Sequence, residues 1–592
     1  MHKVMNRSEV ASDRIWSVED ILDESELPKI FSDIENGCRE ILSYKNKLTV
    51  KNIVECLLAR SKIGYKIEKA YVYIYLKSDE DKSNVHYLEL GEKIDNLSVK
   101  FSSACSFIEP TVASFPIVDL KKLKENPAEP YSYFSMYFDA VIRSKKHLLS
   151  AKEEALLSET YGFSGDFSTA FSMFDNVDAD FGEIEIEGQT VKLSHGVVSV
   201  CLQNQNEAIR KEAYEKMYAS YRKNINTIAA IYAGNVKKDW FYTKARKFGS
   251  CLEKALYGEA IPEKVYDNLI SVVNDHTKYM HKYVAYRKKA LKQKELHMYD
   301  MYVPIVADVE KQVGYDEAFD IVVKALAPLG KDYTDMLLQA KKDRWLDVEE
   351  TPNKKSGAYS WAVYGTHPFV LLNHKGTMHD VFTITHEMGH AMHSYYSNKS
   401  QCYEKAEYCI FIAEIASTVN EVLLIKHLLK EATGNERKYL LSYYIDMIRT
   451  TLFRQTMFAE FERFSHETIE KGEGLGYEKM NDFYSGLNKK YYGDSVITDE
   501  NIAYEWARIP HFYRSFYVYK YATGITCAIN IANSILVDSS FVNKYKDFLS
   551  YGGSKYPMDI LQAVNIDLTK KTPYINAMRE FRSILDELVK MK

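Results

Sequence analysis

The spacing of apolar residues along the first part of the chain most limits the folds open to it. From about residue 24 to residue 153 they recur every three or four positions, as in Ile53, Leu57, Ile63 and Ile67, which is the pattern of amphipathic helices. Proline and glycine, which interrupt helices, number only 13 and 26 among 592 residues. We therefore expect a mainly α protein of long helices joined by short loops.

The length of the chain predicts more than one lobe. A chain of 592 residues exceeds the size at which a single hydrophobic core stops growing, so we expect at least two lobes with a crevice between them. Residues 181–193 interrupt the helical pattern, because apolar and polar residues alternate around Gly188 as in a β-hairpin. We therefore divide the chain into an N-terminal helical lobe, 1–195, that ends in this hairpin, and a second domain, 196–592.

Further elements are expected beyond this boundary. Residues 206–248 and 262–292 have the pattern of long, charged amphipathic helices, and Pro262 is suited to the first helical position of the second. Residues 356–361 and 368–373 have the composition of two short strands, separated by a turn. We expect these strands to form a small sheet just upstream of the segment that carries the chemistry.

Composition excludes several classes of function. The formal net charge is −5 and basic residues are interleaved with acidic ones, so we expect no nucleic-acid partner. The 8 cysteines form no CxxC pair, which indicates reduced thiols in a cytoplasmic protein. We find neither a secretion signal nor an apolar stretch of about eighteen residues, so we expect no membrane association. No obligate protein partner is evident.

One segment carries a metal-binding motif. A helix is predicted from Thr377 to His393, because Thr377 and Asp380 can form a capping box. Its centre contains the sequence HEMGH, from His386 to His390. Histidines at positions i and i+4 project from one helix face and are close enough to share a tetrahedral Zn²⁺. The motif predicts a zinc site on this helix.

The glutamate that follows the first of these histidines suits a catalytic role. Glu387 can reach the open side of the metal, as a general base for a water whose pKa the metal lowers. A random HExxH is expected about 0.03 times in a chain of this composition. The alternative is that His386 and His390 are ordinary helix histidines. We interpret the neighbouring His379 and His393 as surface or boundary residues.

A third ligand is expected downstream. Glu414 lies in an apolar helical stretch, where a carboxylate needs a cation nearby; a buried salt bridge would be the alternative. Glu421 shares its helix face and could accept a hydrogen bond from a ligand histidine. Gly389 destabilises the helix in which it lies. Close packing against the helix that carries Glu414 would offset this cost. We therefore predict one catalytic zinc per chain, held by His386, His390 and Glu414.

These motifs together resemble the thimet oligopeptidase family of zinc metallopeptidases and, within it, oligoendopeptidase F. The resemblance implies a mostly helical, two-lobed shell around a deep substrate channel, with a small β-sheet beside the zinc-binding helix. It also implies an endopeptidase that acts on short unstructured oligopeptides. The similar segments span nearly the whole chain: 14–20, 181–193, 357–361, 367–369, 380–397 and 511–524.

The resemblance also suggests residues that bind the substrate. Gly357, Ala358 and Tyr359 would lie on an edge strand along which an extended peptide pairs through its backbone. The small size of the first two residues suits such an approach.

The resemblance also implies a catalytic role for three aromatic residues near the C-terminus. Family members carry a histidine and tyrosines that contact the substrate carbonyl, and these match His511, Tyr517 and Tyr521. Some relatives carry a further tyrosine where this chain has Gly524, to which we assign no role.

The predicted function is hydrolysis of oligopeptides by a water that Glu387 activates at the zinc. One alternative is a zinc exopeptidase, such as a carboxypeptidase or peptidyl dipeptidase, because these enzymes share the motif. Another is a peptide-binding protein that uses the metal only for structure, although such a protein would not need Glu387.

Overall fold

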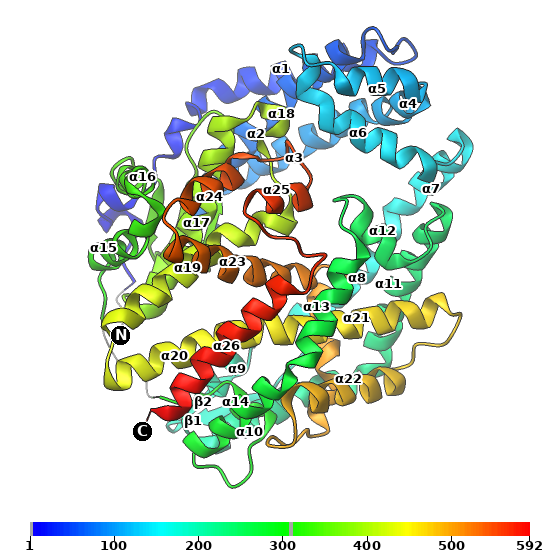
Figure 1. The fold of residues 1–592 in the computed structure, drawn as a ribbon. Helices are drawn as coiled ribbons and strands as arrows, with labels where there is room; N and C mark the ends of the chain where they lie inside the picture. The colour runs from blue at the N-terminus through cyan, green and yellow to red at the C-terminus, as the bar shows by residue number, and fades with distance from the viewer. Residues whose placement is uncertain (1–3, 307–311, 592) are drawn as a thin grey trace. The chain divides into compact units, whose positions relative to one another are not determined.

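Helices dominate the computed structural model (Figure 1), as predicted. The structure describes residues 4–306 and 312–591. They form two compact units, each built from separate stretches of the chain. Unit 1 consists of Met1–Leu148, Glu310–His427 and Ile531–Ile566, and unit 2 of Leu149–Val309, Leu428–Asn530 and Asp567–Lys592. The predicted division after residue 195 falls inside unit 2 and stays a prediction, as does the substrate channel.

The N-terminal part of unit 1 is helical, as its apolar spacing predicts. Ile34, Ile74 and Ile94 are fully buried where the first three helices pack together, and a second core lies beneath the next three. The six helices are α1 (Leu27–Ser43), α2 (Ile53–Glu80), α3 (Val85–Cys105), α4 (Ile108–Ser114), α5 (Ile117–Glu125) and α6 (Ser135–Ser144).

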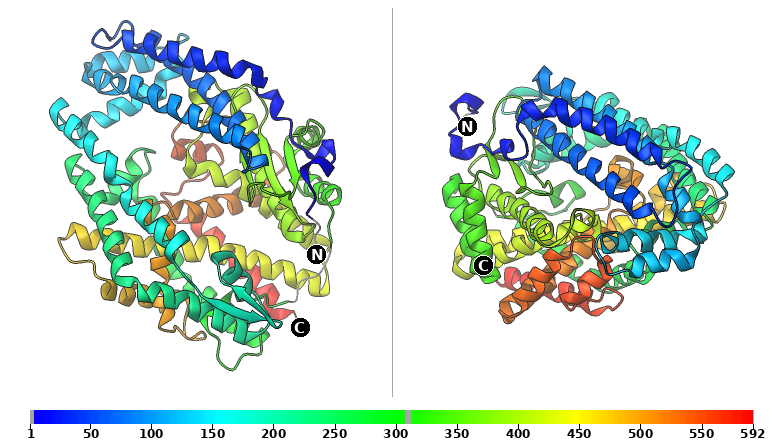
Figure 2. Two further views of the ribbon diagram at one scale, coloured as in Figure 1. Left: turned by 180° about the vertical axis from the view of Figure 1, so that it is seen from behind. Right: turned by 90° about the horizontal axis from the view of Figure 1, so that it is seen from above.

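The rest of unit 1 surrounds a small sheet. Its strands are β3 (Leu346–Glu349), β4 (Tyr359–Trp361) and β5 (Phe369–His374). The order is β3-β5-β4, with β5 parallel to β3 and antiparallel to β4. Figure 2 shows this sheet beside the helix that contains the HEMGH segment. The helices of this part are α15 (Tyr315–Ala325), α16 (Lys331–Lys342), α17 (Met378–Ser400), α18 (Tyr403–Ala406), α19 (Ile410–Glu431), α24 (Phe541–Ser550) and α25 (Pro557–Ala563).

Strands β4 and β5 lie where the sequence predicts them, but β3 was not predicted. Two of its four residues, Asp347 and Glu349, are acidic and buried, which is unusual in a strand of a sheet core. Asp347 forms ion pairs with Arg7 and Lys354, and Glu349 pairs with Arg14. Two of these three partners, Arg7 and Arg14, come from a distant part of the sequence and help to make this strand possible.

The predicted hairpin is confirmed. Strands β1 (Glu183–Ile186) and β2 (Gln189–Lys192) are antiparallel. Between them Glu187 and Gly188 both have positive φ, 52° and 79°, which is typical of the two-residue turns that match the twist of a hairpin. The hairpin packs against α10 (Glu207–Lys223) in unit 2 (Figure 1).

The long helices predicted in unit 2 are each divided in two. Residues 206–248 form two helices that break at Asn224, whose side-chain amide bonds the carbonyl of Ser220 and competes with the helix. Residues 262–292 break at His276, and Pro262 is the N-cap residue, not the first helical residue. The helices of unit 2 are α7 (Ala151–Ser164), α8 (Asp166–Met173), α9 (His195–Leu202), α10 (Glu207–Lys223), α11 (Ile225–Ala245), α12 (Cys251–Tyr257), α13 (Glu263–Asp275), α14 (Thr277–Ala290), α20 (Gly434–Ile448), α21 (Arg454–Glu470), α22 (Tyr477–Tyr492) and α26 (Thr572–Lys590). Helix α23 (Tyr519–Val537) begins in unit 2, and its residues from Ile531 onward belong to unit 1.

Two further expectations concern the whole chain. Among the helices of the described residues, none combines the length and the apolar character needed to cross a bilayer. All eight cysteines are free thiols, and four of them are fully buried.

Candidate metal centre

Helix α17 begins as the sequence predicts. The hydroxyl of Thr377 accepts the N–H of Asp380 at 3.3 Å, and the carboxylate of Asp380 accepts the N–H of Thr377 at 2.7 Å. The helix continues past its predicted end at His393 to Ser400. The buried hydroxyl of Ser397 donates to the carbonyl of Ala406 and ties this last part of the helix to α18.

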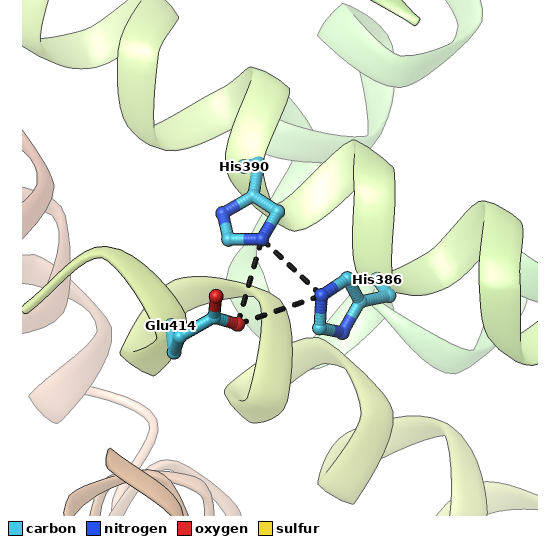
Figure 3. Close-up of side chains that lie close together, drawn as sticks. All are labelled: His386, His390 and Glu414. Carbon is cyan, nitrogen blue, oxygen red and sulfur yellow. Dashed lines mark hydrogen bonds and ion pairs between the residues drawn. The ribbon is translucent and has the colours of Figure 1, made fainter. Parts of the chain in front are cut away.

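The three residues predicted as metal ligands converge in unit 1 (Figure 3). Nε2 of His386 lies 3.2 Å from Nε2 of His390. One carboxylate oxygen of Glu414, on α19, lies 3.6 Å from the first of these nitrogens and 3.7 Å from the second. The donor atoms therefore form a nearly equilateral triangle.

The size of this triangle fits a zinc ion. Tetrahedral bonds of about 2.1 Å separate neighbouring donor atoms by about 3.4 Å. The three distances in the structure lie on either side of that value. Two imidazoles and one carboxylate are also a donor set that zinc accepts, with a fourth position left for water or substrate.

A second carboxylate fixes the orientation of one imidazole. Oε1 of Glu421 lies 3.3 Å from Nδ1 of His386. Because a carboxylate accepts hydrogen bonds, the neutral ring keeps its proton on Nδ1, which leaves the lone pair of Nε2 available to a metal ion.

The pKa values of the two histidines are shifted in opposite directions. Burial opposes the charged form of His386, but the contact with Glu421 and the charges of Glu387 and Glu414 outweigh it and raise its pKa to about 9. Burial and the neighbouring charge of His386 lower the pKa of His390 to about 3. Three carboxylates facing two imidazoles give the site an excess of negative charge, which a divalent cation would offset.

Glu387 lies between the helix and the sheet. It is 8% exposed, and this burial, with the charge of Glu414, raises its pKa to about 7 although His386 and a backbone hydrogen bond from Ser360 act to lower it. A carboxylate with a pKa near neutrality can both accept and release a proton at neutral pH.

The two helices of the site cross closely, as the glycine in the motif predicts. A Cβ atom on Gly389 would lie 2.5 Å from the Cα of Ser417 and 2.9 Å from the carbonyl oxygen of Ala416. Such distances leave no room for a side chain. The contact sets how near α19 comes to α17, and so how near Glu414 comes to the histidines.

Of the three residues predicted on an edge strand, Tyr359 is the first residue of β4, and Gly357 and Ala358 directly precede it. Strand β4 pairs with β5 on one side, and no other described strand pairs with it. Gly357 has a φ of 83°, and its carbonyl accepts the side chain of Asn373 at 2.8 Å. The phenol of Tyr359 donates to Asp79 at 2.5 Å, so this side chain is engaged in the fold.

His511, Tyr517 and Tyr521 lie together in unit 2. Their ring centroids are 6.0 Å apart for His511 and Tyr517, 5.9 Å for His511 and Tyr521, and 5.4 Å for the two tyrosines. Burial, with the charges of Arg514 and Arg454, lowers the pKa of His511. At neutral pH this imidazole is therefore uncharged and carries one N–H.

Comparison with known proteins identifies the family. The family model described as Peptidase family M3 matches residues 200–580, and the model described as Oligopeptidase F matches residues 118–181. The chain belongs to peptidase family M3.

Relatives within family M3 match almost the entire chain. Oligopeptidase PepF of Bacillus subtilis is 38% identical, over 99% of this chain and 88% of the relative. The Oligoendopeptidase F homolog of Borreliella burgdorferi is 36% identical, over 99% of this chain and all of the relative.

Solved structures of two further bacterial proteins share the fold. A putative peptidase from Chlamydophila abortus is 33% identical with a TM-score of 0.91, and each chain is covered completely. Oligoendopeptidase-F from Enterococcus faecium is 31% identical with a TM-score of 0.75, over 96% of this chain and 99% of the other. The chain is therefore an M3 metallopeptidase, and the resemblance to oligoendopeptidase F is confirmed.

For one histidine near the site of this M3 peptidase, the burial in the structure contradicts the interpretation made from the sequence. His379 is exposed, as expected, but His393 is fully buried. Its ring stacks on Tyr408 with the centroids 3.7 Å apart, and burial lowers its pKa to about 3. The interpretation of His393 as a surface or boundary residue was wrong, because the packing partner belongs to a segment beyond the helix.

The sequence analysis missed one polar residue that joins the helices of the site. Asn420 is fully buried on α19. Its amide donates to the carbonyl of Thr385, next to the first histidine, at 3.3 Å and to the phenol of Tyr333 at 3.2 Å. An asparagine within an apolar helical run was the available signal, because buried amides need partners.

Proposed function

We propose that this M3 peptidase is a zinc-dependent endopeptidase that hydrolyses short, unstructured oligopeptides. The observation that carries the proposal is the triangle of donor atoms from His386, His390 and Glu414, with Glu387 beside it. The full-length similarity to proteins named oligopeptidase or oligoendopeptidase supports the choice of substrate.

His386, His390 and Glu414 would hold one zinc ion per chain. When bound, zinc polarises a carbonyl group and lowers the pKa of a coordinated water towards neutrality. The positive charge would also lower the pKa of Glu387 from about 7 and favour its ionised form. Glu421 would keep His386 in the tautomer that binds metal through Nε2.

Glu387 would act as the general base. It would accept a proton from the attacking water and deliver it to the leaving amine, so that no covalent intermediate is needed. Its burial supports this role, because a carboxylate that is removed from bulk water gains basicity.

His511, Tyr517 and Tyr521 would donate hydrogen bonds to the oxyanion that develops on the substrate carbonyl. A neutral imidazole and a phenol are both suitable donors. The lowered pKa of His511 supports a neutral donor at this position.

The substrate backbone would pair with the edge strand β4, preceded by Gly357 and Ala358. Since the phenol of Tyr359 is bound to Asp79, Tyr359 would contribute its backbone groups and not its side chain. The eight free thiols support a reducing, cytoplasmic environment.

The experiment that tests this function is cleavage of a quenched fluorescent nonapeptide whose two termini are blocked. An endopeptidase cuts this peptide and an exopeptidase does not. We expect hydrolysis that stops after treatment with a chelator and returns when zinc is added. Cleavage only of peptides with a free terminus would favour an exopeptidase. Binding without cleavage would favour a peptide-binding protein.

A further inference from the structure

Two buried acidic side chains in unit 2 hold the segment that joins His511 to Tyr517. The backbone N–H of Phe516 donates to Glu462 on α21. The hydroxyl of the preceding residue, Ser515, donates to Asp239 on α11. Glu462 is fully buried and Asp239 is 8% exposed, so water does not compete strongly for either hydrogen bond.

The backbone of this segment has an unusual conformation. Phe516 has a φ of 52°, a region that bulky residues rarely occupy. Its ring is 3% exposed and packs against His466 and Tyr266, with centroid distances of 4.6 Å and 5.8 Å. A conformation of this kind persists only where the surrounding structure imposes it. Here the hydrogen bond to Glu462 and the buried ring impose it.

His466 connects the carboxylate of Asp239 to the backbone carbonyl of Glu462. Its Nδ1 lies 2.8 Å from the carbonyl oxygen of Glu462, and its Nε2 lies 3.3 Å from Asp239. Burial opposes a charge on this ring, but the hydrogen bond and the charge of Asp239 outweigh it and raise the pKa of His466. The network therefore links α11, α21 and the segment with Phe516.

We propose that Glu462 and Asp239 are positioning residues of the peptidase reaction, which fix the segment that carries His511 and Tyr517. This inference rests on the proposed roles of those two residues. Tyr517 directly follows Phe516, and its carbonyl accepts the N–H of Lys520 at 3.1 Å, at the start of α23. A change of conformation at Phe516 therefore moves Tyr517.

His511 depends on the same segment. This histidine belongs to the short 3₁₀ turn Pro510–Tyr513, which leads directly into the segment with Phe516. The ring of His511 lies nearly parallel to that of Tyr517. Displacing a hydrogen-bond donor by about 1 Å can slow an enzymatic reaction about a hundredfold. The buried network thus sets where the donors lie, although neither carboxylate takes part in the chemistry.

The test replaces the acceptor and compares two substitutions. Glu462→Leu leaves the N–H of Phe516 without a partner, and we expect kcat to fall about tenfold to a hundredfold. KM should change less than about threefold, because the donors act on the transition state. Burial raises the pKa of Glu462 to about 8, so Glu462→Gln keeps both the acceptor and the neutral state and should restore most of kcat.

Two more variants separate positioning from loss of folding. Ser515→Ala removes only the hydroxyl that bonds Asp239, and it should lower kcat even if Glu462→Leu does not fold. Thr468→Val on α21 is the matched control, since its buried hydroxyl bonds the carbonyl of Phe464 in the same helix. The control should keep wild-type kcat. Zinc content and melting temperature are measured for each variant.

A double substitution connects the network to the donor. If Glu462 acts through Tyr517, adding Glu462→Leu to Tyr517→Phe should lower kcat little further. The inference is overturned if Glu462→Leu and Ser515→Ala keep wild-type kcat, or if the effects of the double variant multiply fully. If Tyr517→Phe and His511→Ala themselves leave kcat unchanged, the proposed oxyanion roles fail, and the positioning inference fails with them.

Discussion

The carboxylate of Glu421 lies 3.3 Å from Nδ1 of His386, on the side of the imidazole away from Glu414. This contact selects the tautomer in which Nε2 is available to a metal ion. The charge of Glu421 also accounts for much of the rise in the pKa of His386. In the proposed zinc site, Glu421 would thus control how His386 binds the metal without being a ligand itself.

Glu421→Ala should therefore weaken zinc binding about tenfold to a hundredfold without loss of the fold. The measurement is a competition for zinc with a chromophoric chelator. Glu431→Ala is the matched control, because Glu431 is the exposed last residue of the same helix. Equal zinc affinities for the two variants would show that Glu421 does not support His386.

Glu387→Gln should remove hydrolysis but keep the metal. The amide cannot accept a proton from water, and loss of a general base typically slows a reaction about a hundredfold to ten-thousandfold. Since this substitution leaves all three predicted ligands in place, elemental analysis should still find one zinc per chain. Turnover comparable to the wild type would contradict the role of Glu387.

Glu414→Ala should lose the metal itself. Two imidazoles alone hold zinc poorly, whereas three protein ligands are the usual minimum of a catalytic site. We expect little zinc after dialysis and no hydrolysis of the blocked nonapeptide. Full occupancy in this variant would place the third ligand elsewhere, with Glu421 the next candidate.

Gly389→Ala tests the crossing of α17 and α19. Alanine favours a helix over glycine by about 1 kcal/mol, but here its methyl group would meet the backbone of Ser417 at 2.5 Å. Overpacking typically costs about 1 to 3 kcal/mol, and backbone atoms yield less readily than side chains. We expect a lower free energy of unfolding and weaker zinc binding, because Glu414 moves away from the histidines.

The control for this variant is Gly486→Ala on α22. A Cβ atom there meets nothing within 4 Å, so the higher helix propensity of alanine should leave the protein as stable as the wild type or slightly more so. Chemical denaturation measures both variants. A Gly389→Ala protein as stable as Gly486→Ala would contradict the tight crossing.

The helices and the grouping of the zinc-site residues follow from local rules. Apolar residues every three or four positions specify helices without reference to the rest of the chain. Histidines at i and i+4 share a helix face wherever the helix lies, which places His386 beside His390. The carboxylate of Glu414 could be recognised because a charged group in an apolar helical stretch needs a cation nearby.

The features that the sequence analysis did not predict depend on contacts between separate elements of the fold. Strand β3 carries buried Asp347, and no local pattern shows that Arg7, from the start of the chain, pairs with it. The burial of His393 depends on Tyr408, which stacks on its ring. The hydrogen bond from Phe516 to Glu462 joins residues on different elements. Tertiary structure decides each of these cases, so periodicity and spacing could not reveal them.

The aromatic cluster of unit 2 gives the last prediction, because a catalytic role competes there with simple packing. Tyr517 and Tyr521 lie 5.4 Å apart, ring to ring, and both contact the ring of His511, as they would in either case. If the phenol of Tyr521 donates to the oxyanion, Tyr521→Phe should lower kcat about a hundredfold to a thousandfold.

KM in the Tyr521→Phe variant should barely change, because the hydrogen bond strengthens only in the transition state. If the ring only packs, phenylalanine keeps nearly all of its buried area and kcat should stay within about a few fold of the wild type. Tyr519→Phe is the control on the same helix, where a fully buried ring packs against Tyr266. Near wild-type kcat in Tyr521→Phe, with normal zinc content and melting temperature, would shift the donor role to Tyr517 or His511.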